Sequence, residues 1–296
     1  MNNLKLELNF PDAIGKLRGL INRFRLQRTV YKILLRGRGI AFDSYRDFEQ
    51  DDDASMIDWK ASLRANKLLA KKYLEERERE VYFLVDVSNS MLFGSRKRLK
   101  AELAAELTVS LANVITNSGD KIGLILYSDK IVKMVKAGMG GNALSSLMKE
   151  LSDSSNYGGN SNLSEVLKKV SAIVTSPFSA FIFVSDFINL NEDIGKELKK
   201  ISLRFETMAF MIRDRLDEEL RIPYQIVVQN PNSKEQLLID PSLDSFNFNQ
   251  EVERKKEEIR KMFFTSRIDL LELNDEETFF LNLTSFLRKR ASGAKV

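Results

Sequence analysis

Three oxygen-bearing side chains follow one apolar run at alternate positions: Asp86, Ser88 and Ser90. The run itself, residues 81–85, reads Val-Tyr-Phe-Leu-Val and ends at the aspartate. One carboxylate and two hydroxyls can direct their oxygens to a single point, and oxygen is the ligand that a hard cation such as Mg²⁺ takes in proteins. The same Asp-x-Ser-x-Ser pattern is also typical of a turn or of a helix N-cap. The spacing alone therefore leaves two interpretations open, a metal site and a cap.

The elements that would position these side chains form an α/β pattern. The run before Asp86 predicts a strand that is buried on both faces. Segments with helical periodicity separate it from further expected strands, which are residues 121–127, 131–135, 179–184, 205–212, 225–228, 236–239 and 267–273. Strand–helix alternation predicts a doubly wound, mostly parallel α/β sheet. In such sheets ligands bind where the strands end, which is where Asp86 stands.

Composition excludes several kinds of chemistry. The 296 residues include no cysteine and no histidine, so thiolate metal sites, cysteine nucleophiles, histidine bases and the usual zinc sites are excluded. No apolar stretch approaches the roughly 20 residues of a membrane span. The first residues, with Lys5 and Glu7, do not form a signal peptide. We therefore expect a cytoplasmic protein.

Positive charge is concentrated near the N-terminus. The net charge is +4, and the segment from Ala13 to Phe42 contains eight lysines and arginines and no acid. Ile14, Leu17 and Ile21 lie within it at helical spacing, which predicts an amphipathic basic helix. Such a helix can make peripheral contact with a membrane, but we favour a helix whose apolar stripe packs on its own protein. Because the remaining charge is balanced, we expect no nucleic-acid partner.

The region between this helix and the Asp86 strand is rich in interleaved acidic, basic and aromatic residues. Short strands are expected around Phe42–Phe48 and Leu68–Leu74, and Trp59, the single tryptophan, is expected on a helical turn as a buried anchor. Its motifs are Gly37-Arg-Gly-Ile-Ala-Phe-Asp43, Tyr45-Arg-Asp-Phe48, Asp51-Asp52, Ile57-Asp-Trp-Lys60 and a Glu-Arg pair before the strand that ends in Asp-x-Ser-x-Ser-Met. By composition alone, such density indicates only a salt-bridged surface.

The order of these motifs resembles the bacterial domain-of-unknown-function family 58, over about residues 30 to 290. The part from Ile57 to Ser90 carries the most specific resemblance. Two positions depart from the family pattern, because Asp51 stands where glycine is usual and Ser55 where arginine is usual. The resemblance implies a small N-terminal region, residues 1–79 with the basic helix and a β-containing part, followed by a von Willebrand factor A-like domain, residues 80–296.

The resemblance also implies a metal site that holds Mg²⁺ or Mn²⁺. Ser161 fills a slot that is threonine in von Willebrand factor A domains, so it keeps the hydroxyl and loses the β-branch. Asp186 follows the strand at residues 179–184 and corresponds to the last member of that site. In this interpretation Ser88, Ser90 and Ser161 coordinate the cation directly, while Asp86 and Asp186 act partly through water.

The function implied is that of a non-catalytic adaptor. A partner protein would present an acidic residue to the cation, and the expected partner is a MoxR-type AAA+ ATPase or its client, in protein assembly or maturation. The alternative is a Mg²⁺-dependent phosphohydrolase, whose site also begins with an aspartate after a strand. That chemistry needs a second aspartate two positions on, where this chain has Ser88, and the absence of histidine leaves no evident general base.

Overall fold

The chain folds into two compact units. The computed structural model describes residues 5–23, 42–49, 54–73, 79–190, 193–219, 224–229, 235–274, 281–283 and 285–286. Met1–Leu35 and Arg79–Val296 form the large unit, and Arg36–Glu78 form the small unit. This division differs from the predicted one in one respect, because the N-terminal helix belongs to the large unit.

The large unit is built on one six-stranded sheet. In spatial order its strands are β10 (Asp269–Leu273), β7 (Glu206–Ile212), β6 (Ser179–Ser185), β3 (Glu80–Asp86), β4 (Lys121–Tyr127) and β5 (Ile131–Gly138). Neighbouring strands are parallel except for β4 and β5, which are antiparallel. The predicted doubly wound, mostly parallel sheet is therefore confirmed.

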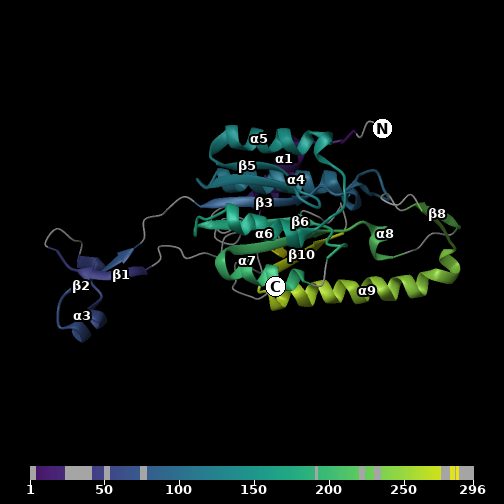
Figure 1. Ribbon diagram of the computed structural model, residues 1–296. Coiled ribbons are helices and arrows are strands. Elements are labelled where there is room, and N and C mark those ends of the chain that lie inside the picture. The colour runs from purple at the N-terminus through teal and green to yellow at the C-terminus, as the bar shows by residue number, and fades with distance from the viewer. Residues whose placement is uncertain are drawn as a thin grey trace. The chain divides into compact units, whose positions relative to one another are not determined.

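Helices cover both faces of the sheet, as Figure 1 shows. One face carries α1 (Phe10–Arg23), α4 (Lys100–Thr116) and α5 (Gly140–Ser152), and the other carries α6 (Leu163–Ile173), α7 (Ile194–Arg204) and α9 (Pro241–Thr265). Alternate residues of β3 serve the two faces, with Phe83 in the core beneath α4 and Leu84 in the opposite core. This two-sided burial explains the unbroken apolar run before Asp86.

Helix α1 lies against α4. Phe10, Ala13, Leu17 and Ile21 are buried, with Leu17 at 0% exposure, and Ile14 is partly buried against the same core. Glu102 and Glu106 of α4 accept hydrogen bonds from the backbone N–H groups of Glu7 and Asn9, which precede α1. The favoured interpretation, a helix packed on its own protein, is confirmed, and the apolar stripe that a membrane would need is covered. Most of the basic block, from Phe24 to Ala41, lies outside the described residues.

Two helices of the large unit are not predicted by the sequence patterns. Helix α7 was overlooked although Ile194, Leu198 and Ile201 have helical spacing and are buried. Helix α8 (Arg215–Glu218) is a single capped turn after β7. The expected hairpin is present as β8 (Ile226–Gln229) and β9 (Gln236–Ile239), which pair antiparallel.

A helix near the C-terminal end is described only in part. Residues 281–283 and 285–286 are helical, and Leu283 and Phe286 are buried in the core. The nearby apolar residues Phe279, Phe280 and Leu287 lie outside the described residues. No helix in the described part of the chain combines the length and apolar character needed to cross a membrane.

The small unit is an antiparallel ribbon with one helix. Strands β1 (Phe42–Asp47) and β2 (Leu69–Tyr73) pair as expected, and α3 (Trp59–Ala65) begins after the N-cap residue Asp58. The expectation of a buried Trp59 is wrong, because its side chain is 63% exposed.

The buried residue of α3 is instead Ser62, whose hydroxyl accepts a hydrogen bond from the Leu69 backbone N–H at 2.9 Å. The Gly37–Gly39 motif, Asp51–Asp53 and the side chain of Ser55 lie outside the described residues.

Candidate metal site

Three separate segments meet at the carboxyl edge of the sheet. Strands β3 and β6 are parallel neighbours, so Asp86 at the end of one lies near Asp186, which directly follows the other. The third segment is the loop of residues 157–162, which leads into α6 and carries Ser161. The topology of the sheet thus brings together residues that are 75 to 100 positions apart in the chain.

The loop of residues 157–162 is held against the end of β3 by backbone hydrogen bonds. The Gly158 N–H donates to the Val87 carbonyl at 2.7 Å, and the Asn89 N–H donates to the Gly159 carbonyl at 2.8 Å. Both glycines have positive φ, +128° and +84°, a conformation that other residues rarely adopt. The glycine pair therefore permits the path that brings Ser161 to Asp86.

Asp86 is the centre of the polar contacts. Its Oδ2 accepts hydrogen bonds from the hydroxyls of Ser161 at 3.1 Å and Ser185 at 2.8 Å, and its Oδ1 accepts one from the Ser88 N–H at 2.9 Å. The hydrogen bond from the Ser88 N–H closes a local turn, which is one of the two interpretations that the Asp-x-Ser-x-Ser pattern allows. Ser88 also precedes the short 3₁₀ helix η2 (Asn89–Leu92), but its side chain makes no capping hydrogen bond. The Ser88 hydroxyl lies 3.2 Å from that of Ser90.

The electrostatics of Asp86 are those of a buried carboxyl beside another acid. Its side chain is 1% exposed, and its pKa is raised to about 6, mainly by burial. The negative charge of Asp186 contributes to this rise, whereas the hydrogen bonds from Ser88 and Ser185 act in the opposite direction. Asp186 is therefore close enough to disfavour the ionised form of Asp86.

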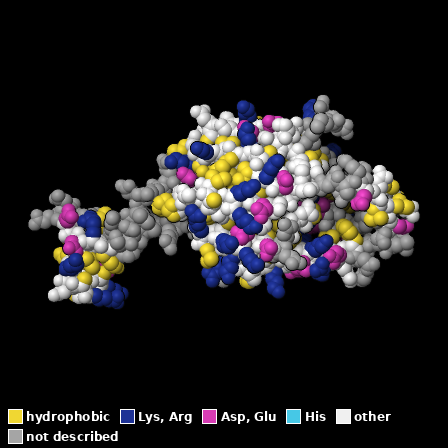
Figure 2. All heavy atoms as spheres, in the orientation of Figure 1, with side chains coloured by type: hydrophobic (Ala, Val, Ile, Leu, Met, Phe, Trp, Pro, Cys, Tyr) yellow, Lys and Arg dark blue, Asp and Glu magenta, His cyan; other side chains and the backbone are white. Residues whose placement is uncertain are grey.

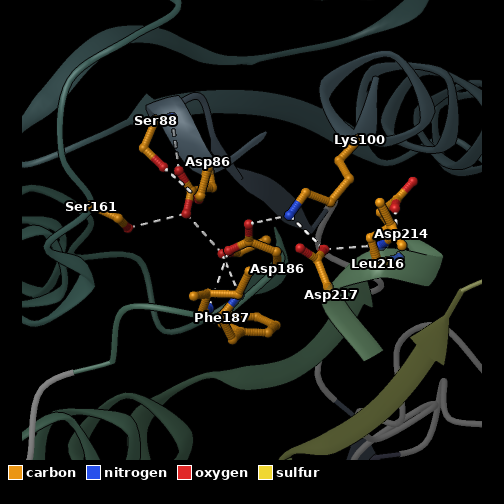
Figure 3. A network of polar contacts seen from close by, with 12 residues as sticks. Asp86, Ser88, Lys100, Ser161, Asp186, Phe187, Asp214, Leu216 and Asp217 are labelled. Atoms are coloured by element: carbon orange, nitrogen blue, oxygen red, sulfur yellow. Dashed lines mark hydrogen bonds and ion pairs between the residues drawn. The ribbon is translucent and has the colours of Figure 1, made fainter. Parts of the chain in front are cut away.

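A buried lysine contacts the second carboxylate. Lys100, the first residue of α4, donates from Nζ to Asp186 Oδ2 at 2.8 Å and to Asp217 Oδ2 at 2.7 Å, and it is 2% exposed. The other oxygen of Asp186 accepts a hydrogen bond from the Ile188 N–H at 3.1 Å. Figure 3 shows Lys100 between the two aspartates, on the side of Asp186 away from Ser161.

A pocket of about 370 Å³ opens above these contacts. Ser88, Ser90 and Ser161 line it, whereas Asp86 and Asp186 do not and are each 1% exposed. The three serines thus line the pocket, and the two carboxylates are buried beside it.

This donor set fits a hard divalent cation. Hydroxyl and carboxylate oxygens are the ligands that Mg²⁺ and Mn²⁺ prefer, and the residues present offer no softer donor. Within the described ranges, no three acidic side chains cluster as they would in a carboxylate-rich cation site. A cation here would therefore be held by three neutral hydroxyls and two carboxylates, with open positions toward the pocket.

The structure brings all five predicted residues to one place. Asp86, Ser88 and Ser161 are joined by hydrogen bonds, Ser90 lies beside Ser88, and Asp186 influences the pKa of Asp86.

Sequence reasoning missed three further residues. The sequence could have indicated Lys100, because its spacing places it with Leu107 and Leu111 on the buried side of α4, where a lysine is unusual. Ser185 was visible as a polar strand end but was not assigned to the site. Asp217 lies on the four-residue helix α8 and gave no signal.

Comparison with known proteins finds relatives over most of the chain. The profile of the family described as "Protein of unknown function DUF58" matches residues 44–262. An uncharacterized protein of Mycobacterium tuberculosis, Rv1480, is 22% identical over 265 residues, which are 88% of this chain and 83% of that protein. Mb1516, an uncharacterized protein of Mycobacterium bovis, matches to the same extent.

Two solved structures are more distantly similar. The conserved hypothetical protein BatB from Bacteroides thetaiotaomicron is 13% identical, with a TM-score of 0.44, and the match covers 72% of this chain and 99% of that one. The von Willebrand factor A (VWA) domain of SpRpn10 is 10% identical, with a TM-score of 0.40, and the match covers 70% of this chain and 94% of that one.

Proposed function

The chain belongs to the DUF58 family, and from that premise we propose that it is a protein-binding adaptor whose binding surface is a Mg²⁺ site. The site would be formed by Asp86, Ser88, Ser90, Ser161 and Asp186. One observation carries the proposal: three serines from two segments line one pocket beside two buried carboxylates.

The chemistry of the donors explains why such a site would bind a protein. Two carboxylates neutralise a divalent cation at most, and the neutral hydroxyls add oxygen ligands without adding charge. A bound Mg²⁺ or Mn²⁺ would supply an open coordination position toward the pocket. An aspartate or glutamate of a partner fits that position, because it brings both an oxygen and a negative charge.

The geometry supports a non-catalytic role. A phosphohydrolase of the alternative kind would use Asp86 as its nucleophile, but this carboxylate is 1% exposed, does not line the pocket and already accepts three hydrogen bonds. Position 88 is serine rather than a second aspartate. We expect no release of phosphate from a generic aryl phosphate in the presence of Mg²⁺, and turnover that is lost in Asp86→Asn would favour the enzyme instead.

The proposed partner is a protein. On the face that Figure 2 shows, lysines and arginines are mixed with acids over the large unit rather than gathered into a basic stripe, as nucleic-acid binding would require. The family resemblance adds a specific candidate, a MoxR-type AAA+ ATPase or its client.

A pull-down with a purified MoxR-type ATPase tests this proposal. At fixed ionic strength, the immobilised chain should retain the ATPase in Mg²⁺ and lose it in EDTA. Ser88→Ala should also lose it, because that change removes one proposed ligand. Asn189→Ala is the matched control, since Asn189 lines the same pocket but is not a proposed ligand. Equal recovery with and without Mg²⁺, together with a neutral Ser88→Ala, would contradict the proposed binding surface.

A further inference from the structure

Lys100 places a positive charge at the edge of the proposed cation site. Its ammonium is buried, and the structure gives it two carboxylate partners, Asp186 and Asp217, at 2.8 and 2.7 Å. The ring of Phe93 lies 5.7 Å away on the pocket side. A buried charge is tolerated only when it is paired, and each of the two carboxylates can serve as the partner of this ammonium.

Asp217 is held in position independently of the cation site. Its Oδ2 accepts a hydrogen bond from the Asp214 N–H at 3.0 Å, which closes the capping box of α8. Asp214 in turn accepts a hydrogen bond from the Ser95 N–H at 2.9 Å, five residues before Lys100. The next residue, Glu218, pairs with Lys256 of α9 at 2.5 Å. Helix α8 is therefore fixed on both sides.

We propose that Lys100 is a built-in counter-ion of the metal site. Its ammonium competes with the divalent cation for Asp186, and the attraction of the ammonium to Asp217 weakens that competition. This inference rests on the proposed function and adds a means of regulation to it. The competition is electrostatic, because the ammonium and the cation are both attracted to the same carboxylate and repel each other. Its extent depends on how the ammonium is shared between Asp186 and Asp217.

The consequence is that cation binding and partner binding are coupled. To the extent that its ammonium is shared with Asp186 rather than with Asp217, Lys100 offsets part of the charge of Asp186, so a divalent cation bound there is neutralised incompletely. An acidic side chain from a partner completes the neutralisation. The cation is then bound weakly by the chain alone and more tightly when the partner's carboxylate is present, a reciprocal relation that holds for any two coupled ligands.

Two variants change the competition in opposite directions. In Lys100→Met with Asp217→Asn, the ammonium and its outer partner are both removed, and Asp186 is left free for the cation. In Asp217→Asn alone, the ammonium has only Asp186 as a charged partner. With Mg²⁺ as the probe in isothermal titration calorimetry, we expect affinity to rise by about tenfold in the double variant and to fall by about tenfold in the single one.

The matched control is Lys256→Met with Glu218→Gln. It makes the same kind of change in charge on the neighbouring residue of α8, and Lys256 is likewise mostly buried, at 9% exposure, between Glu218 and Glu272. We expect its Mg²⁺ affinity to equal that of the wild type. Circular dichroism establishes that each variant is folded, and if the Lys100 double variant does not fold, Asp217→Asn alone still decides the question.

The outcomes separate the two proposals. Wild-type Mg²⁺ affinity in folded Asp217→Asn, or in the folded Lys100 double variant, would overturn the counter-ion role and leave the metal site standing. A similar change in the Lys256 control would also overturn it, because the effect would then belong to α8 in general. If neither the wild type nor the Lys100 double variant binds Mg²⁺, the metal site and the counter-ion role both fail.

Discussion

The two compact units use their charged residues in different ways. In the small unit, polar contacts are local or exposed: Asp58 caps the helix that follows it, and Lys67 pairs with Asp47 at 2.6 Å with both side chains more than half exposed. In the large unit, Asp86 is buried and contacts hydroxyls 75 and 99 positions away, those of Ser161 and Ser185. The dense charges of the small unit therefore form a solvated surface. The single acid at the end of the buried strand β3 instead forms part of the candidate site.

The two units also differ in how far their apolar residues are buried. The large unit encloses two extended cores, one on each face of its sheet. In the small unit, Leu69 and Ala70 are buried, but Trp59 and Leu63 are 63% and 82% exposed. We infer that stability is concentrated in the large unit and that the small unit depends on a few hydrogen bonds.

Leu17→Ala should have the largest effect and should act on the large unit. Leu17 is 0% exposed, and truncating a fully buried leucine costs about 2–5 kcal/mol of unfolding free energy. Urea unfolding followed by far-ultraviolet circular dichroism measures the loss. Leu203→Ala is the matched control, because Leu203 on α7 is 74% exposed and the same change should cost less than about 0.5 kcal/mol.

The same variant tests whether the units are distinct. The indole N–H of Trp59 gives a single nuclear magnetic resonance signal that reports on the small unit alone, because the chain has no other tryptophan. We expect Leu17→Ala to shift the transition of the large unit more than that of this signal. Equal shifts would mean that the two units unfold as one, which contradicts the division.

Asp58→Ala should have a smaller effect, confined to the small unit. Asp58 Oδ1 accepts hydrogen bonds from the backbone N–H groups of Lys60 and Ala61, both at 3.1 Å, and loss of an N-cap costs about 1 kcal/mol. Amide hydrogen exchange in α3 should accelerate, with Lys60→Ala as a control that leaves the cap in place. An equal acceleration in the strands of the large unit would contradict a local role for Asp58.

The two predicted site residues that lie at the edge of the sheet, Asp86 and Asp186, share one physical property. Asp86 and Asp186 each follow a long apolar run, and a parallel sheet necessarily brings the ends of such runs to one edge. Ser161 was placed by family resemblance, since nothing in its loop apart from the glycine pair announces its position. When a run of apolar residues is long enough to be buried on both faces of a sheet, the sequence is enough to predict the strand.

The residues that sequence reasoning misplaced or missed depend on tertiary contacts. Trp59 is a large apolar residue, yet it is exposed, whereas Ser62 of the same helix is buried and bonded to Leu69, a contact that no propensity predicts. Lys100 is polar within an otherwise apolar stripe, and its partner Asp217 lies 117 positions away on a single helical turn. Pairings of this kind are fixed only when the whole sheet is assembled.

Ser161→Thr should have the smallest effect on stability, because it should leave the stability of both units unchanged. The added methyl group restricts the first side-chain torsion and so reduces the freedom that the hydroxyl loses on binding a cation. We expect Mg²⁺ affinity to rise by no more than about tenfold, a change of about 1.4 kcal/mol, as measured by calorimetry. Ser155→Thr, at an exposed position outside the pocket, is the control. A loss of affinity would contradict the expected benefit of the restricted torsion.

The most direct test of the central claim is a Mg²⁺ titration of the wild type and Asp86→Asn. The amide preserves the shape of the side chain and an acceptor for its hydroxyl partners, but it removes one of the two carboxylate charges. We expect measurable binding to the wild type, a loss of at least about a hundredfold in Asp86→Asn, and no change in Asp153→Asn, an exposed control. Equal Mg²⁺ affinity in the wild type and Asp86→Asn would contradict the metal site.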